Sequence, residues 1–245
     1  MNNQLTIEIS VFSFDAALKA AEAGADRIEL CAGSSEGGTT PPASLISSVC
    51  REVSIPVYPI IRPRGGGFLY SDQEFEMMKE DIRFCKTAGC KGVATGILLS
   101  DNRIDVRRIK EIVDLASPMG VTFIRAFDLV PDPMEALEDI IETGCERILT
   151  SGQAPYATDA LQLLRYLQKN AKGRISIMPG SGINSENLQT ILENTEVSEI
   201  HASARIAVDN ENPAIDHLGF GQRIDCNPEQ IREMRQIADH WQKSR

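Results

Sequence analysis

The sequence predicts a (β/α)8 TIM barrel, in which eight parallel strands form a central barrel surrounded by outer helices. Short apolar strands alternate with amphipathic helices along the chain, and 245 residues divide into eight units of about 30. No stretch rich in Pro, Gly or Ser divides the sequence, so we predict a single domain over residues 1–245. The alternative is an open doubly wound sheet, but residues 10–13, the first strand-to-helix turn, contain no glycine. We therefore expect no nucleotide cofactor.

The eight strand candidates are short runs of apolar and β-branched residues. They cover residues 6–11, 27–31, 57–62, 92–95, 121–125, 147–150, 175–178 and 199–201. Gly24, Gly89 and Gly144 each stand between an amphipathic run and a strand, where a helix ends best on a left-handed residue. Pro59 lies inside the third strand and cannot donate to a strand ladder, so we expect a bulge or a shifted boundary there.

Capping residues mark the helix starts. Ser13 precedes one helix, and Ser71 with Glu74 has the spacing of a capping box. Asp132 and Asn227 each precede a proline that suits the first helical position.

Composition excludes several classes of function. The chain has 25 Lys and Arg against 35 Asp and Glu, a formal net charge of -10, which argues against a nucleic-acid partner. It lacks a secretory leader and any run of 18 apolar residues, so we expect a cytoplasmic protein with no membrane partner. The six cysteines are too scattered for a disulfide framework, which predicts reduced thiols. They are Cys31, Cys50, Cys85, Cys90, Cys145 and Cys226.

Polar residues alternate with apolar ones in the first two strands. Because the isoleucines of the first strand must face the helices, Glu8 and Ser10 point into the barrel, as Glu29 and Cys31 do in the second strand. A carboxylate in this low-dielectric interior needs a partner.

Four arginines follow strands at their C-terminal ends, where barrel enzymes build active sites: Arg62, Arg64, Arg125 and Arg205. We interpret them as partners of the two carboxylates. Because they outnumber these carboxylates, we also interpret them as a clamp for a small anion. Glu8 or Glu29 would then act as acid or base. The alternative is an internal ion-pair network that only fills the barrel.

The last loops add further candidates. Gly180 and Gly182 follow the seventh strand and Ser203 follows the eighth, a position where many barrels bind phosphate. Asp128 follows the fifth strand, and His201 in the eighth could serve as acid or base near neutral pH. A hydrogen-bonded core histidine is the alternative.

Cys31 is the cysteine predicted to face the mouth. Sulfur favours Cu(I) over hard cations, but one thiol needs a second ligand, such as Met178, Cys226 or His201. The cysteines near helix ends are interpreted as packing residues: Cys85, Cys90 and Cys145.

Residues 206–226 form a long predicted connection without obvious structure. Such segments are often lids or contact surfaces, so we expect either a lid or a contact with a neighbouring subunit.

Seven motifs together resemble the copper homeostasis protein CutC family. They are GADRIELC (24–31), SEGGTTP (35–41), IRPRGG (61–66), FLYSD (68–72), RAFD (125–128), RILTSG (147–152) and MPG (178–180). The resemblance implies a cytoplasmic (β/α)8 barrel that forms a homo-oligomer and acts in copper homeostasis through Cu(I) binding or trafficking. No reaction is firmly attached to the family. A copper site would centre on Cys31.

Three residues depart from the family pattern. Ile124 stands where the family commonly has a histidine, Gly67 replaces an aspartate, and Ser10 replaces a cysteine of some relatives. Each departure weakens a metal site more than it weakens the fold. Two hypotheses therefore stand: a copper-homeostasis barrel with Cu(I) at Cys31, or an enzyme for a small phosphorylated or carboxylated anion.

Overall fold

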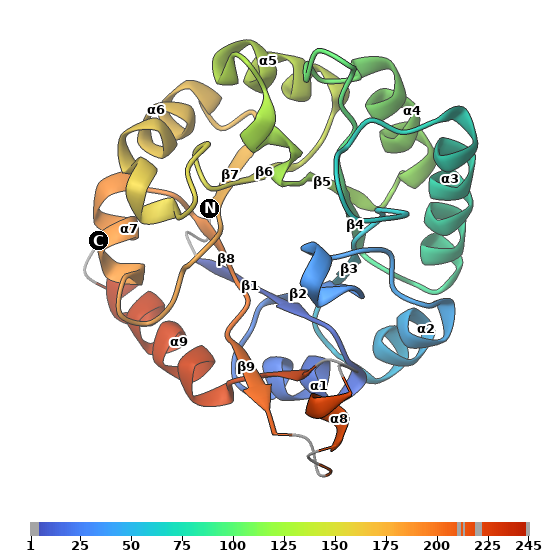
Figure 1. The fold of residues 1–245 in the computed structure, drawn as a ribbon. Coiled ribbons are helices and arrows are strands. Elements are labelled where there is room, and N and C mark those ends of the chain that lie inside the picture. The colour runs from blue at the N-terminus through green and yellow to red at the C-terminus, as the bar shows by residue number, and fades with distance from the viewer. Residues whose placement is uncertain (1–4, 210–211, 213, 219–221, 244–245) are drawn as a thin grey trace.

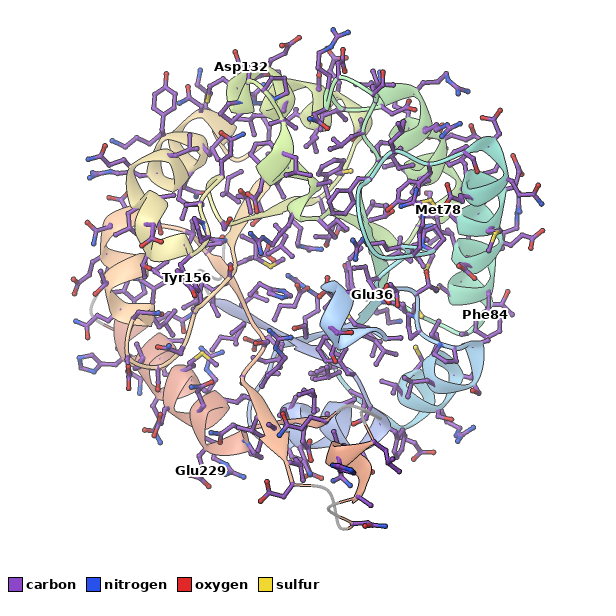
Figure 2. All side chains as sticks on the ribbon, viewed as in Figure 1. Glu36, Met78, Phe84, Asp132, Tyr156 and Glu229 are labelled. Carbon is purple, nitrogen blue, oxygen red and sulfur yellow. The ribbon has the colours of Figure 1, made fainter. Side chains whose placement is uncertain are left out.

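Eight strands form a ring at the centre of the molecule, and helices surround the ring (Figure 1). The computed structural model describes residues 5–209, 212, 214–218 and 222–243. This arrangement is the predicted (β/α)8 barrel, and side chains fill the interior of the ring (Figure 2). No helix in the described ranges is long and apolar enough to cross a membrane.

All eight predicted strands are present, although several end a few residues from the predicted boundary. Their bounds are β1 (Thr6–Val11), β2 (Arg27–Leu30), β3 (Val57–Pro59), β4 (Gly92–Thr95), β5 (Gly120–Phe123), β6 (Arg147–Thr150), β7 (Ser176–Pro179) and β8 (Glu199–Ala202). Parallel hydrogen bonds join them into two four-stranded sheets, with the orders β3-β2-β1-β8 and β4-β5-β6-β7. At one seam, β7 and β8 lie side by side without a ladder in the described residues.

The other seam, between β3 and β4, is explained by Pro59. This residue pairs with Leu30 of β2 and has no N–H to donate toward β4. Ile60 and Ala94 then form an isolated parallel bridge, and the Ile61 N–H donates to the Ala94 carbonyl at 2.7 Å. The effect of the proline is therefore a shortened strand joined to β4 by a single bridge.

The outer helices begin and end at the predicted signals. Their bounds are α1 (Phe14–Glu22), α2 (Ala43–Glu52), α3 (Asp72–Thr87), α4 (Val106–Ala116), α5 (Pro133–Thr143), α6 (Leu161–Ala171), α7 (Leu188–Thr195) and α9 (Pro228–Lys243). Ser71 and Glu74 form the capping box, and the side chains of Ser13, Asp132 and Asn227 accept backbone N–H groups. The three predicted helix-ending glycines all have positive φ angles: Gly24, Gly89 and Gly144.

The alternation predicted for the first two strands is confirmed. Ile7, Ile9, Ile28 and Leu30 are fully buried in the layer between strands and helices. Their sequence neighbours point into the ring, so the interior of the barrel is polar where these strands pass through it.

The segment after β8 differs from the unstructured connection that was predicted. It contains β9 (Arg205–Val208), the short helix α8 (Ala214–His217) and β10 (Arg223–Cys226), with β9 and β10 paired antiparallel. An ion pair between Lys19 and Asp225, 2.5 Å long, fixes β10 to α1. Residues 210, 211, 213 and 219–221 lie outside the described part, so a lid or a subunit contact stays a prediction.

Candidate functional site at the barrel mouth

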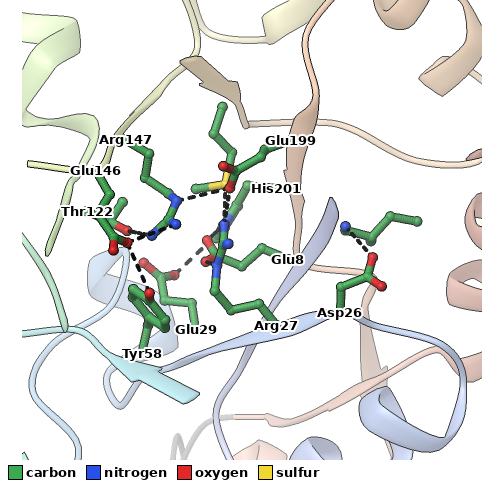
Figure 3. Close-up of polar contacts among 12 residues, drawn as sticks. Glu8, Asp26, Arg27, Glu29, Tyr58, Thr122, Glu146, Arg147, Glu199 and His201 are labelled. Carbon is green, nitrogen blue, oxygen red and sulfur yellow. Dashed lines mark hydrogen bonds and ion pairs between the residues drawn. The ribbon is translucent and has the colours of Figure 1, made fainter. Parts of the chain in front are cut away.

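Two carboxylates and an imidazole form a chain at the floor of the mouth (Figure 3). Glu8, Glu29 and His201 come from the neighbouring strands β1, β2 and β8, with Glu8 in register with His201. Oε1 of Glu8 lies 2.7 Å from Nδ1 of His201, whose Nε2 lies 3.8 Å from Oε2 of Glu29. All three side chains are buried. The imidazole is therefore held between two carboxylates.

A network of arginines lies beneath this chain. Arg27 contacts Glu8 and lies 2.6 Å from Glu199, and Nε of Arg147 lies 3.0 Å from the same Glu199 carboxylate. The Tyr58 ring faces both guanidinium groups, 5.3 Å from that of Arg27 and 5.0 Å from that of Arg147. An internal ion-pair network therefore fills the lower part of the barrel, but Arg27 and Arg147 form it in place of the four arginines named in the alternative interpretation.

The predicted partners of Glu8 are therefore wrong. Its partners are Arg27 and His201, and none of the four arginines that follow strands contacts it. Arg27 and Arg147 are the first residues of β2 and β6. The alternation that placed Glu29 inside also places Arg27 inside, because residues two apart share a face of a strand. That signal was present in the sequence.

The network sets the protonation of each group. Burial opposes the charge of Glu8, but Arg27 and His201 outweigh it and lower the pKa of Glu8 to about 2. Burial raises the pKa of Glu29. Burial also opposes an imidazolium, yet Glu29 and Glu8 outweigh it and raise the pKa of His201. Glu8 therefore stays ionised, while Glu29 and His201 both hold a proton to higher pH than a free carboxyl or imidazole group.

A cavity of about 420 Å³ opens above this floor and gathers most of the predicted site residues. This volume suits a small-molecule site. The predicted residues that line it are Glu29, Cys31, Arg62, Arg125, Asp128, Gly182, His201, Ser203 and Arg205. Glu8, Arg64 and Gly180 are outside this lining.

Arg62 brings a buried positive charge to the cavity. It is only 5% exposed, and its guanidinium donates to the carbonyls of Glu36, Gly38 and Gly66 at 2.6–2.7 Å, with the Phe68 ring 5.0 Å away. Its Nε has no hydrogen-bond partner, and no carboxylate of the described residues lies within 4.0 Å of it. Carbonyl groups accept three hydrogen bonds from this guanidinium without neutralising its charge, so Arg62 brings an uncompensated positive charge to the mouth.

Asp128 orders the loop around Arg125. Its carboxylate lies 2.7 Å from Nε of Arg125 and accepts the backbone N–H groups of Ser151 and Gln153 at 3.0 and 3.2 Å. The Thr150 hydroxyl also donates to it at 2.5 Å. These bonds occupy both carboxylate oxygens, which suits a positioning role better than the predicted catalytic one.

Two other predicted residues, Arg64 and Gly180, lie outside the cavity lining and contact the residues around it. The guanidinium of Arg64 lies 2.6 Å from Glu74 and faces the Tyr70 ring. Gly180 packs below the mouth, where a Cβ atom would meet Leu149 at 2.5 Å and His201 at 3.4 Å. A side chain at Gly180 would therefore displace Leu149 and pack against His201 at an ordinary contact distance.

Cys31 faces the mouth without a second sulfur. Its thiol lies 3.4 Å from the Glu29 carboxylate, and burial together with the Glu29 charge raises its pKa well above the usual value. Met178 instead accepts from Arg27 at 3.2 Å, and the Cys226 thiol donates to the Ala16 carbonyl at 3.4 Å. Cys31 is the one sulfur among the described residues lining the cavity, so this donor set does not suit Cu(I).

Glu8, Glu29 and His201 form a different donor set. Their ligand atoms lie within 4.8 Å of one another. Carboxylate and imidazole groups suit harder or borderline metal ions. In the fold, however, both imidazole nitrogens already face carboxylates.

The CutC family model matches residues 5–206. This chain belongs to the CutC family. The copper homeostasis protein cutC homolog of Homo sapiens is 49% identical over 208 residues, which cover 85% of this chain and 76% of the relative. A CutC family protein of Sinorhizobium medicae is 41% identical over 239 residues, or 97% of each chain.

A solved CutC structure has the same fold. The crystal structure of CutC from Streptococcus agalactiae superposes with a TM-score of 0.77 at 30% identity, covering 81% of this chain and 98% of the other. The family resemblance and the barrel predicted from the sequence are both confirmed. The CutC match ends near β9, so the hairpin of β9 and β10 lies mostly outside it.

Proposed function

We propose that this CutC protein acts in copper homeostasis. We also propose that its barrel mouth binds a small phosphorylated or carboxylated anion and that a side chain of the mouth donates a proton to this anion or accepts one from it. The names of its relatives support the first part. The observation that carries the second is the Glu8–His201–Glu29 chain beneath a cavity lined by arginines.

Each part of the mouth has a chemical task in this proposal. Ionised Glu8 fixes the imidazole orientation through Nδ1, and Nε2 of His201 faces Glu29. Glu29 lines the cavity and has a raised pKa, as a general acid or base working near neutral pH requires. Arg62, Arg125 and Arg205 hold the anion, aided by loop N–H groups at Gly182.

Phosphate binding tests the anion site. We expect inorganic phosphate to bind wild type in calorimetry, and Arg125→Gln to weaken binding by about 10- to 100-fold, since a charged hydrogen bond contributes about 1.5–3 kcal/mol. Arg64→Gln is the matched control, because Arg64 lies outside the cavity lining. Equal affinity in wild type and Arg125→Gln would refute the clamp.

Copper binding at Cys31 is the competing hypothesis for the mouth. The family name favours it, while the single sulfur among the described lining residues opposes it. Titration with Cu(I) against a chelator separates the two. If Cys31→Ala lowers the Cu(I) affinity of the protein and Arg125→Gln leaves phosphate binding intact, the mouth is a copper site.

We also infer a cytoplasmic location and a homo-oligomer. All six cysteines are free thiols, which fits a reducing compartment. Sedimentation of the purified protein tests the oligomer, and a purely monomeric species would contradict it.

A further inference from the structure

Cysteine thiols also lie close together at a second place, near the ends of α2 and α3, which are neighbours in the outer ring (Figure 1). Sγ of Cys50 lies 3.3 Å from Sγ of Cys90, and the Cys85 thiol interacts with Cys90 as well. Cys50 lies in the last turn of α2, whereas Cys85 lies in the last turn of α3 and Cys90 just beyond it. From the sequence we interpreted Cys85 and Cys90 only as packing residues.

Backbone hydrogen bonds set this geometry. Gly89, with a φ of +86°, ends α3 in the left-handed conformation. The Cys90 N–H donates to the Cys85 carbonyl at 3.1 Å, and the Gly89 N–H donates to the Lys86 carbonyl at 3.3 Å. This is a Schellman motif, which fixes Cys90 beside Cys85. The end of α3 is therefore fixed before any ligand binds, and Cys50 of α2 meets it through the 3.3 Å contact with Cys90.

The thiol pair is protonated and reachable from one side. Cys85 and Cys90 are buried, whereas Cys50 is half-buried. The hydrogen bond with Cys50 lowers the pKa of Cys90, but Cys85 and burial outweigh it and raise this pKa to about 12. A metal ion that binds here must therefore displace protons.

We propose that Cys50 and Cys90 bind one Cu(I) ion outside the barrel mouth. Thiolates select Cu(I), Zn²⁺ or iron–sulfur clusters, and the last two require four ligands. Among the described residues, no third Cys, His, Asp or Glu donor atom lies within 4.8 Å of both sulfurs. Cu(I) accepts two thiolates. Both thiol protons leave to solvent on binding and the copper keeps its oxidation state, so the step needs no oxidant.

This site deepens the proposed role in copper homeostasis, and it does not depend on the anion site at the mouth. It differs from Cys31 in position and in donor set. If Cys50 and Cys90 do not bind Cu(I), the phosphate experiment at the mouth keeps its meaning. If phosphate does not bind at the mouth, the Cu(I) titration keeps its meaning.

Anaerobic titration with Cu(I) against the chelator bicinchoninate tests the site. We expect wild type to take one ion from the chelator with release of two protons, and Cys50→Ser to bind at least tenfold more weakly. Cys145→Ser is the matched control, because Cys145 is a buried free thiol elsewhere in the fold. Cys31→Ser should also retain the ion. Circular dichroism checks that each variant is folded, and Cys90→Ala serves as the second variant.

Three results would overturn the proposal. The first is unchanged Cu(I) affinity in folded Cys50→Ser and Cys90→Ala. The second is loss of the ion only in Cys31→Ser. The third is a disulfide between Cys50 and Cys90 after copper treatment, found by mass spectrometry of the alkylated protein, since it would show oxidation of the thiols in place of Cu(I) binding.

Discussion

Glu8 connects the two polar layers of the barrel, because it contacts Arg27 below and His201 above. We expect Glu8→Gln to lower the free energy of unfolding by about 1–3 kcal/mol, since it removes one of the two carboxylate partners of the buried Arg27 and leaves Glu199 as the other. Urea unfolding at neutral pH measures this change. A loss under about 1 kcal/mol would contradict the role given to Glu8.

Glu8 also predicts a dependence of stability on pH. Its pKa falls from 4.5 to about 2 in the folded protein. The stability it contributes is therefore present above pH 4.5 and is lost as the pH falls from 4.5 toward 2. Wild type should lose stability in that window more steeply than Glu8→Gln, which lacks the titrating group.

His201 gives a second residue-level prediction. Because the Glu29 charge helps to raise the pKa of His201, Glu29→Gln should lower it. NMR titration of the imidazole signals measures this pKa, and His240 on α9 serves as internal reference. An unchanged His201 pKa would contradict the electrostatic coupling between the two groups.

For single residues, the sequence predicted which side chains point into the barrel better than it predicted which residues these side chains contact. Alternation placed Glu8, Glu29 and Cys31 inside the barrel, which the structure confirms. Their contacts depend on which residue of the neighbouring strand lies beside each of them. This pairing register cannot be derived from a single sequence. Arg27 is opposite Glu8 for this reason.

At the scale of elements, β3 and β4 fit together only because Gly92 has no side chain. A Cβ atom there would lie 2.0 Å from the Tyr58 ring, which faces both arginines of the network. Gly92→Ala should therefore destabilise the fold by about 1–3 kcal/mol through overpacking. Thermal unfolding measures the change, with Gly67→Ala as control, because no atom lies within 4 Å of a Cβ there. Equal melting temperatures would contradict the packing.

Helix boundaries could be predicted from the sequence where residues close to the boundary determine them. Capping residues and left-handed glycines act within one helix turn, so helix ends could be predicted. The hairpin of β9 and β10 could not, because its pairing joins residues separated by a long stretch of sequence and its docking depends on Lys19 of α1. Pro59 shortened β3 as its missing N–H requires.

At the scale of the whole molecule, charge is unevenly distributed. The chain carries a net charge of -10, and Arg62, Arg125 and Arg205 meet at one cavity whose lining also holds Glu29, Glu36 and Asp128. The mean charge of the chain predicts repulsion of anions, whereas the buried charge of Arg62, which no carboxylate of the described residues neutralises, predicts local attraction of a small one. Topology brings these arginines together from three separate parts of the chain, after β3, after β5 and at the start of β9.

The most direct measurement is a crystal structure of the protein grown in inorganic phosphate. We expect a phosphate in the mouth, hydrogen-bonded to Arg125 and to the loop at Gly182, with Glu29 and His201 beneath it. A cavity without an anion at a saturating phosphate concentration would contradict the proposed anion site.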